Sequence, residues 1–366
     1  MKDRSVENLV FVCFSNPFED ASKNLQNVDY RHADWTYILK RAEQNKTTLV
    51  LLKNLLSIDR GLPEDTVEKL RVFLDNEEKS FDSWIHALSS TLSIFNEESP
   101  RLNYLLIKSL RGYPHRSVDL DFLLQGKKSL IGARNALRRK GCKISTADDK
   151  NKSFCLLDLG IESVEIDLYS EITWRNLKLT FFDQKEMWLR RKKTIFAEME
   201  IPTPSNEDEV LITSAHSFFG HHYYFLGDLF YLQSVLSKGI DLQYAAKASK
   251  KFGWSLALYS FLQYSNILYQ RVYNRNIVED EVLDRIFNSD RTFIHLVDSF
   301  LYKWSTLRFP SRYPLILEFL VIPEKSVSSL KRDGLSVMLK ETVTLTIDTV
   351  HSVMSRVYIT LISLLK

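Results

Sequence analysis

The apolar residues of the first third of the chain recur at helical intervals. From Asp34 to about Leu110 they are spaced by three and four, as in Trp35, Ile38 and Leu39. This spacing places apolar side chains on one face of a helix. Asp34 fits the N-cap position of the first of these helices. We therefore expect a helical N-terminal arm.

The pattern changes in the middle of the chain, between about residues 117 and 170. The segments 117–124, 152–160 and 163–170 are short runs that are apolar or alternate with polar residues, and polar or Gly-bearing turns bound them. Runs of this kind predict strands. A helix is expected between the first two, with Gly141 as its C-terminal cap.

Helical spacing returns in the last part of the chain. Residues 202–204 have the composition of a linker, and Ser205 is expected to cap a helix that begins the helical region 206–366. Near the N-terminus, residues 9–14 form a strand-like apolar run that has no obvious partner nearby.

These patterns together predict an α+β protein in which a small mixed sheet is flanked by N-terminal and C-terminal helical regions. We expect a helical arm over 1–100, an α/β core over 101–200 and a C-terminal helical domain over 205–366. The composition agrees, because only 11 Gly and 9 Pro in 366 residues leave few breaks between elements.

Net charge is +3, from 49 basic and 46 acidic side chains, which is too balanced to indicate a nucleic-acid binder. Two basic clusters, at 127–143 and 190–193, are expected to be solvated faces rather than polyanion grooves. The cysteines Cys13, Cys142 and Cys155 lack the spacing of a zinc site or a disulfide framework.

The N-terminal apolar run is too short for a signal peptide, and no stretch approaches the roughly 20 apolar residues that span a bilayer. We therefore expect a cytoplasmic protein without a membrane partner.

The clearest chemical feature is an Asp-x-Asp pair, Asp119 and Asp121, in the predicted strand 117–124. Residues i and i+2 of a strand project from the same face. Two adjacent carboxylates raise one another's pKa unless a cation neutralises them, and such ligands suit Mg²⁺ or Mn²⁺. Taken alone, the pair also fits two exposed aspartates at the end of a strand.

A third carboxylate follows in the predicted strand 163–170. A two-metal phosphoryl-transfer site needs about three such ligands. Asp167 is the favoured ligand, and Glu165 is the rival because it shares the same strand face.

Cationic and hydroxyl groups precede the Asp-x-Asp pair. A helix is expected to end at Lys108 and Ser109, and the following loop carries Arg111 and Arg116. These four side chains are candidates to bind the oxygens of a triphosphate.

The combination resembles the core of a family of uncharacterised nucleotidyltransferases in the polymerase-β superfamily. That core reads Leu-Lys-Gly, then Arg, then Asp-Ile-Asp-Leu-Leu-Val, and the counterparts here are Ile107-Lys108-Ser109, Arg116 and residues 119–124. The family also has a helical arm before this core, which corresponds to the N-terminal arm here. Its later Val-Glu-Ile strand corresponds to residues 164–167, and its histidine followed by an Asp-Leu pair corresponds to His216 and Asp228-Leu229. The resemblance covers roughly residues 30–270.

The resemblance implies Mg²⁺- or Mn²⁺-dependent transfer of a nucleoside monophosphate from an NTP to an acceptor, with release of pyrophosphate. Asp119 and Asp121 would hold both ions, and Asp167 would hold the second and help to deprotonate the acceptor hydroxyl. The acceptor could be an RNA end, a protein side chain or a small metabolite.

Two other interpretations remain open. An Asp-x-Asp glycosyltransferase would bind Mn²⁺ and a sugar nucleotide but would need neither the third aspartate nor Lys108 and Ser109. A catalytically weak or inactive nucleotidyltransferase fold would bind a nucleotide or a protein without turnover. A metal site at His216, His221 and His222 is disfavoured, because residues five apart do not share a face of an α-helix.

Overall fold

The computed structural model describes most of the chain. The described residues are 4–58, 62–98, 102–115, 117, 119–145, 152–158, 163–173, 181–287 and part of 288–350. They form two compact units. The sheet unit comprises 1–172, 184–209 and 229–238, and the helical unit comprises 173–183, 210–228 and 239–366. The predicted division into three domains stays a prediction.

The sheet unit begins with the predicted helical arm. Its helices are α1 (Ser5–Ser15), α2 (Ala21–Asn24), α3 (Trp35–Gln44), α4 (Thr48–Ile58) and α5 (Glu64–Glu98). The N-cap prediction is confirmed, since Asp34 Oδ1 accepts a hydrogen bond from the Tyr37 backbone N–H at 3.0 Å.

The predicted strand at residues 9–14 is wrong, because this run lies within helix α1. Its side chains Val10 to Phe14 are all fully buried. A helix that is buried on every side is apolar all round, so a short apolar run does not distinguish it from a buried strand.

Five strands form a mixed sheet. They are β1 (Tyr104–Ile107), β2 (Asp119–Leu124), β3 (Lys143–Ser145), β4 (Lys152–Asp158) and β5 (Ser163–Tyr169). The strand order is β1-β2-β5-β4-β3, in which β2 and β5 are parallel and the other pairs are antiparallel. The three predicted strands and the helix between the first two are confirmed.

The expected helix end at Lys108 is wrong, because residues 104–107 form strand β1. Leu105, Leu106 and Ile107 are buried, and β1 pairs with β2 over its whole length. Pairing with a neighbouring strand has overridden a local pattern that also fits a helix.

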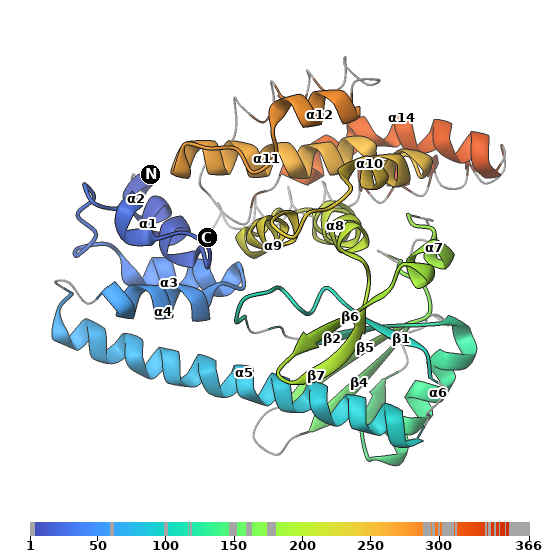
Figure 1. The fold of residues 1–366 in the computed structure, drawn as a ribbon, viewed down its shortest axis with the longest axis horizontal. Coiled ribbons are helices and arrows are strands. Elements are labelled where there is room, and N and C mark those ends of the chain that lie inside the picture. Colours follow the sequence, from blue (N-terminus) through green and yellow to red (C-terminus); the bar gives the residue numbers. More distant parts are fainter. Residues whose placement is uncertain are drawn as a thin grey trace. The chain divides into compact units, whose positions relative to one another are not determined.

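One face of the sheet is covered by α5 and by α6 (Gly126–Arg139) (Figure 1). The core cluster joins Trp84, Leu88 and Phe95 of α5 to sheet residues that include Phe122 and Ile166. Helix α6 ends before Gly141, whose φ of +89° suits the predicted cap.

A short hairpin follows the main sheet and helix α7 (Gln184–Leu189). Strands β6 (Lys192–Phe196) and β7 (Met199–Thr203) are antiparallel. The predicted linker at 202–204 is therefore partly wrong, since two of its residues belong to β7. Ser205 does cap helix α8 (Asn206–Ala215), because its Oγ accepts a hydrogen bond from the Asp208 N–H at 3.2 Å.

The helical unit is built around α11 (Ser255–Tyr273), whose first fifteen residues are all buried. The described part of this unit also contains η1 (His216–His221), α10 (Leu242–Lys251), α12 (Asp280–Phe287) and α14 (Tyr313–Asp333). Glu324 of α14 accepts hydrogen bonds from the N–H groups of Ser255 and Leu256, at 2.8 and 3.1 Å. The residues of α8 and of α9 (Leu226–Leu236) are divided between the two units.

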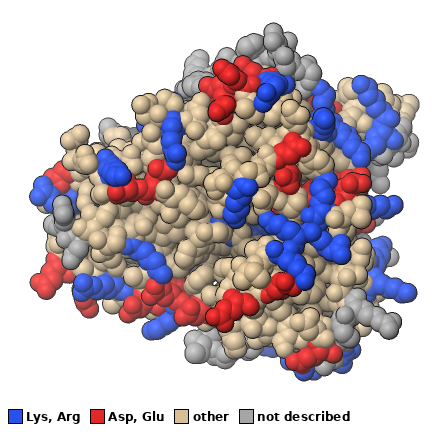
Figure 2. All heavy atoms as spheres, in the orientation of Figure 1, with Lys and Arg blue, Asp and Glu red and all other residues tan. Residues whose placement is uncertain are grey.

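The structure confirms the predicted fold class of a small mixed sheet with flanking helices. Basic and acidic side chains are interspersed over most of the face in view, in keeping with the near-balanced charge (Figure 2). Among the described residues, no helix combines the length and the apolar character that a bilayer crossing needs.

Truncation of Phe122 tests the sheet core. Phe122 is fully buried, and its ring centroid lies 5.2 Å from that of Phe95 and 5.8 Å from that of Tyr104. We expect Phe122→Ala to lower the free energy of unfolding of the sheet unit by about 3–5 kcal/mol in urea denaturation. The control Phe73→Ala removes a ring that is 50% exposed on α5, and it should cost less than about 1 kcal/mol. Equal losses in both variants would contradict this packing.

Candidate functional site

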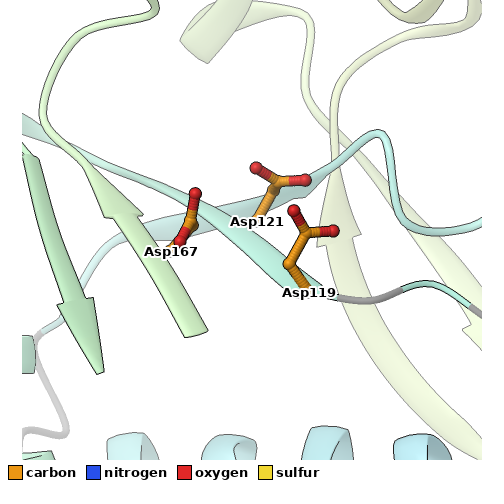
Figure 3. A group of neighbouring side chains, drawn as sticks. All are labelled: Asp119, Asp121 and Asp167. Carbon is orange, nitrogen blue, oxygen red and sulfur yellow. The ribbon is translucent and has the colours of Figure 1, made fainter. Parts of the chain in front are cut away.

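Three aspartates meet on the sheet face opposite α5 and α6. Leu120, Phe122, Ile166 and Leu168 belong to the core under these helices. Side chains alternate along a strand, so the odd-numbered residues of β2 and β5 project from the other face. Asp119, Asp121 and Asp167 each offer one carboxylate oxygen, and these oxygens lie within 4.8 Å of one another (Figure 3).

Strand register selects the third carboxylate. Asp121 pairs with Asp167 across the parallel strands β2 and β5, and Asp119 pairs with Glu165. Among the described residues, the group of converging acidic oxygens includes Asp167 and not Glu165. The geometry therefore favours Asp167 in the choice that the sequence left open.

The ammonium group of Lys108 lies inside this acidic cluster. Its Nζ is 2.8 Å from Oδ1 of Asp121, and the lysine side chain is only 13% exposed. Burial alone would lower the pKa of Lys108, but the carboxylates of Asp121, Asp119 and Asp167 outweigh it and raise this pKa above its ordinary value. Lys108 has a φ of +59°, a backbone conformation that is uncommon for residues other than glycine and that is typical of functional sites.

The carboxylates differ in their electrostatic surroundings. Burial raises the pKa of Asp121, and the negative charges of Asp119 and Asp167 add to this effect against that of Lys108. Burial also raises the pKa of Asp119, but Lys46, Lys108 and a hydrogen bond from Ser117 outweigh it, so that this pKa lies below its ordinary value. The net effect of burial and neighbouring charges is therefore opposite for these two aspartates.

Hydrogen bonds hold the aspartates in place. The Tyr169 hydroxyl donates to Oδ2 of Asp167 at 2.6 Å, and Nε1 of Trp84 donates to the backbone carbonyl of Asp119 at 3.2 Å. Such supporting contacts fix the orientation of a metal ligand.

Ser109 joins the end of β1 to β2. Its hydroxyl donates to the Ile107 carbonyl at 3.0 Å and accepts from the Asp121 N–H at 3.3 Å. The hydroxyl proton of Ser109 is therefore already engaged in a hydrogen bond within the protein. The predicted role of Ser109 in phosphate binding stays a prediction.

Of the two arginines predicted to bind triphosphate oxygens, only one belongs to the described residues. Arg111 is buried at 8% exposure in the loop after β1, and its charge acts on His115 and Tyr231 of the same unit. Arg116 lies outside the described residues. The structure thus places Lys108 against the aspartates and Arg111 in the adjoining loop.

Two residues that lie beside the aspartates were not predicted from the sequence. Tyr169 follows Asp167 by two residues, and i+2 periodicity could have indicated it. Trp84 comes from the helical arm, and only the tertiary fold brings it to β2.

The basic run 190–193 makes contacts within the sheet unit. Arg190 pairs with Asp208, Lys192 with Asn206, and Lys193 with Glu200.

The argument that separated His216 from His221 is wrong. Residues 216–221 form a π-helix instead of an α-helix, and the two imidazole centroids lie 4.2 Å apart. A π-helix is wider than an α-helix and forms its hydrogen bonds between residues five apart, which brings residues i and i+5 closer to the same face. In the same unit, the Ser217 hydroxyl donates to Oδ2 of Asp228 at 2.7 Å. Among the described residues, groups of three or more potential metal ligands comprise only the aspartate cluster.

The segment 107–270 matches the family model of an uncharacterised nucleotidyltransferase. This match confirms the predicted resemblance over slightly less than half of the chain, and it contains all three aspartates. The match ends at residue 270, where the resemblance was expected to end. It does not include the helical arm, which the resemblance was expected to cover in part. No curated protein and no solved structure gives a significant match to the chain.

The donor set fits a hard divalent cation. All the ligands in the cluster are carboxylate oxygens, which suit Mg²⁺ or Mn²⁺ better than softer metals. Burial, together with the charges of Asp119 and Asp167, raises the pKa of Asp121, and a bound cation would favour the ionised form of this carboxylate. The residues present could therefore hold a metal ion.

Charge removal should stabilise the metal-free protein. Asp167→Asn removes one of three crowded carboxylates and keeps an oxygen that accepts from the Tyr169 hydroxyl. We expect a gain of about 1 kcal/mol in the free energy of unfolding, measured by urea denaturation in the presence of EDTA. The control Asp75→Asn, on the exposed surface of α5, should leave stability within about 0.5 kcal/mol. A loss of stability in Asp167→Asn would contradict a repulsive cluster.

Proposed function

We propose that this protein is a metal-dependent nucleotidyltransferase, which moves a nucleoside monophosphate from an NTP to an acceptor hydroxyl and releases pyrophosphate. The observation that carries the proposal is the convergence of Asp119, Asp121 and Asp167, with Lys108 among them. The family match over 107–270 supports the same activity.

The roles follow from position and charge. Asp119 and Asp121 would hold both ions, and Asp167 would hold the second. Bound Mg²⁺ or Mn²⁺ would neutralise triphosphate charge and polarise the reacting phosphoryl group. Asp167 would also accept the proton of the acceptor hydroxyl as its oxygen attacks the α-phosphorus.

The bond between the α-phosphorus and the bridging oxygen to the β-phosphate then breaks, and pyrophosphate leaves. Lys108, whose ammonium group pairs with Asp121 in the structure, would bind triphosphate oxygens, and Arg111 and Arg116 would add counter-charge from the following loop. Catalysis would rest mainly on positioning and charge neutralisation. A covalent enzyme intermediate is not required.

The acceptor is an RNA end, a protein side chain or a small metabolite, and the base of the NTP is unassigned. The predicted cytoplasmic location stays a prediction. A glycosyltransferase and a non-catalytic nucleotide-binding module would give different results in the tests below.

Removal of the paired aspartates tests the metal-binding role. We expect the wild-type protein to bind at least one non-hydrolysable NTP analogue in calorimetry, and only when Mg²⁺ or Mn²⁺ is present. In Asp119→Asn/Asp121→Asn this metal-dependent binding should be lost, because the carboxylates no longer hold the cations that bridge to phosphate. The control Asp75→Asn should bind as the wild type does. Metal-independent binding that survives in the double variant would contradict the assignment.

Turnover is tested with α-labelled NTPs offered together with RNA, protein and small-metabolite pools. Wild-type protein should transfer label and release pyrophosphate, and the double variant should be slower by about a thousandfold or more. Metal-dependent NTP binding without any transfer would indicate a non-catalytic module. Transfer from labelled sugar nucleotides, without pyrophosphate release, would indicate a glycosyltransferase.

A further inference from the structure

The last described part of the helical unit is a pair of helical segments. The first is α14, and every described residue between 335 and 350 is also helical. The hydroxyl oxygens of Ser326 and Thr342 lie 2.7 Å apart. In one straight helix these two residues would be about 24 Å apart, so the second segment is folded back beside α14. We call the described residues of 313–350 the C-terminal hairpin.

One side of the C-terminal hairpin is packed against the rest of the helical unit. On α14, Lys325 and Ser329 are one turn apart and at most 1% exposed. The Lys325 ammonium group donates to the carbonyl of Phe252, the residue after α10, at 3.0 Å. On the second segment, Leu345 and Thr349 are equally buried. Each helix of the hairpin is therefore anchored through one buried stripe.

The direction of the other side follows from helix geometry. Successive residues of an α-helix are about 100° apart around its axis. Leu330 therefore lies about 40° around α14 from Ser326, on the side away from the buried stripe. Leu339 lies about 60° around the second segment from Thr342, again away from the buried stripe. Both helices thus direct these leucines to the outward side of the hairpin.

The outward side is a continuous apolar surface, which we call the hairpin face. It consists of seven aliphatic side chains that are each 45–64% exposed: Val327, Leu330, Leu335, Leu339, Val343, Ile347 and Val350. The exposed residues described between 335 and 350 are all aliphatic except Thr346, whose hydroxyl donates to the Thr342 carbonyl at 2.8 Å. Eight other large apolar side chains of the described residues are exposed, and they are spread over several elements of the sheet unit.

The size of the hairpin face matches an interface between two copies. Seven half-exposed aliphatic side chains present roughly 600 Å², the upper end for the largest apolar patch on a typical monomer. Two such faces packed together would bury roughly 1,200 Å² in total, which reaches the range of stable protein–protein interfaces. An aliphatic face offers no charge to select a partner of different chemistry, but it is complementary to itself across a two-fold axis.

We propose that the hairpin face is a dimer interface, which packs on the same face of a second copy of this chain. Two hairpins would then form a four-helix bundle. Along the second segment, the residues of the face from Leu335 to Ile347 are spaced by four. They form the kind of ridge that fits between the ridges of a facing helix. The inference is independent of the proposed function, because it uses no residue of the aspartate cluster.

Sedimentation equilibrium of the full chain tests the interface. The wild type should sediment with twice the mass of one chain in the micromolar range. In Leu339→Glu/Val343→Glu each copy brings two carboxylates into an apolar seam, so dimerisation should weaken by about a hundredfold or more. These side chains are 52% and 54% exposed in one copy, so the far-UV circular dichroism of the variant should match that of the wild type.

Two further variants complete the test. Leu189→Glu/Ile195→Glu is the matched control, because it adds the same charges at positions of the sheet unit that are 75% and 70% exposed. This control should remain dimeric. Leu339→Ser/Val343→Ser removes apolar surface without adding charge, and it should weaken dimerisation by about tenfold or more. It keeps the test decisive if the glutamates disturb the helix.

Three results would overturn the proposal. A wild-type chain that stays monomeric throughout the micromolar range would mean that residues 351–366 or a different partner cover the hairpin face. Dimers that persist in both hairpin variants would place the contact elsewhere on the protein. An equal loss of dimer in Leu189→Glu/Ile195→Glu would attribute the effect to added charge and not to the hairpin face.

Discussion

The site depends on the repulsion between three carboxylates that a parallel strand pair forces together. The register of β2 and β5 sets Asp121 beside Asp167, and alternation brings Asp119 to the same face. Lys108 is ion-paired with Asp121, but burial and the neighbouring carboxylates still raise the pKa of Asp121. A protein gains no stability from such crowding, so the arrangement is understandable when divalent cations and phosphate supply the missing counter-charge.

The rest of the sheet unit keeps these groups in position. The opposite face of the same strands is packed against α5 and α6, which opposes a shift in register, because a one-residue slip would turn the aspartates of that strand into the apolar core under these helices. Tyr169 and Trp84 then hold the carboxylate and the backbone of individual aspartates. The loop after β1 adds the positive charge of Arg111, which is buried in the same unit.

The sequence predicted what short-range periodicity determines. Alternation in β2 and β5 identified both strands, and the i+2 spacing identified the face shared by Asp119 and Asp121. The sequence did not decide whether Glu165 or Asp167 is the third metal ligand, because that choice depends on the register between strands. Residues 9–14 and 104–107 were assigned to the wrong element, because burial on all sides removes the periodicity that separates helix from strand. The π-helical contact between His216 and His221 and the hydrogen bond from Trp84 to Asp119 depend on tertiary structure.

The most direct test of the central claim is anomalous diffraction from a crystal of the protein soaked with Mn²⁺ and a non-hydrolysable NTP. The account predicts a manganese peak bounded by carboxylate oxygens of Asp119, Asp121 and Asp167, with triphosphate oxygens completing its coordination. A structure with nucleotide bound elsewhere, or with the three carboxylates directed away from any metal ion, would contradict it.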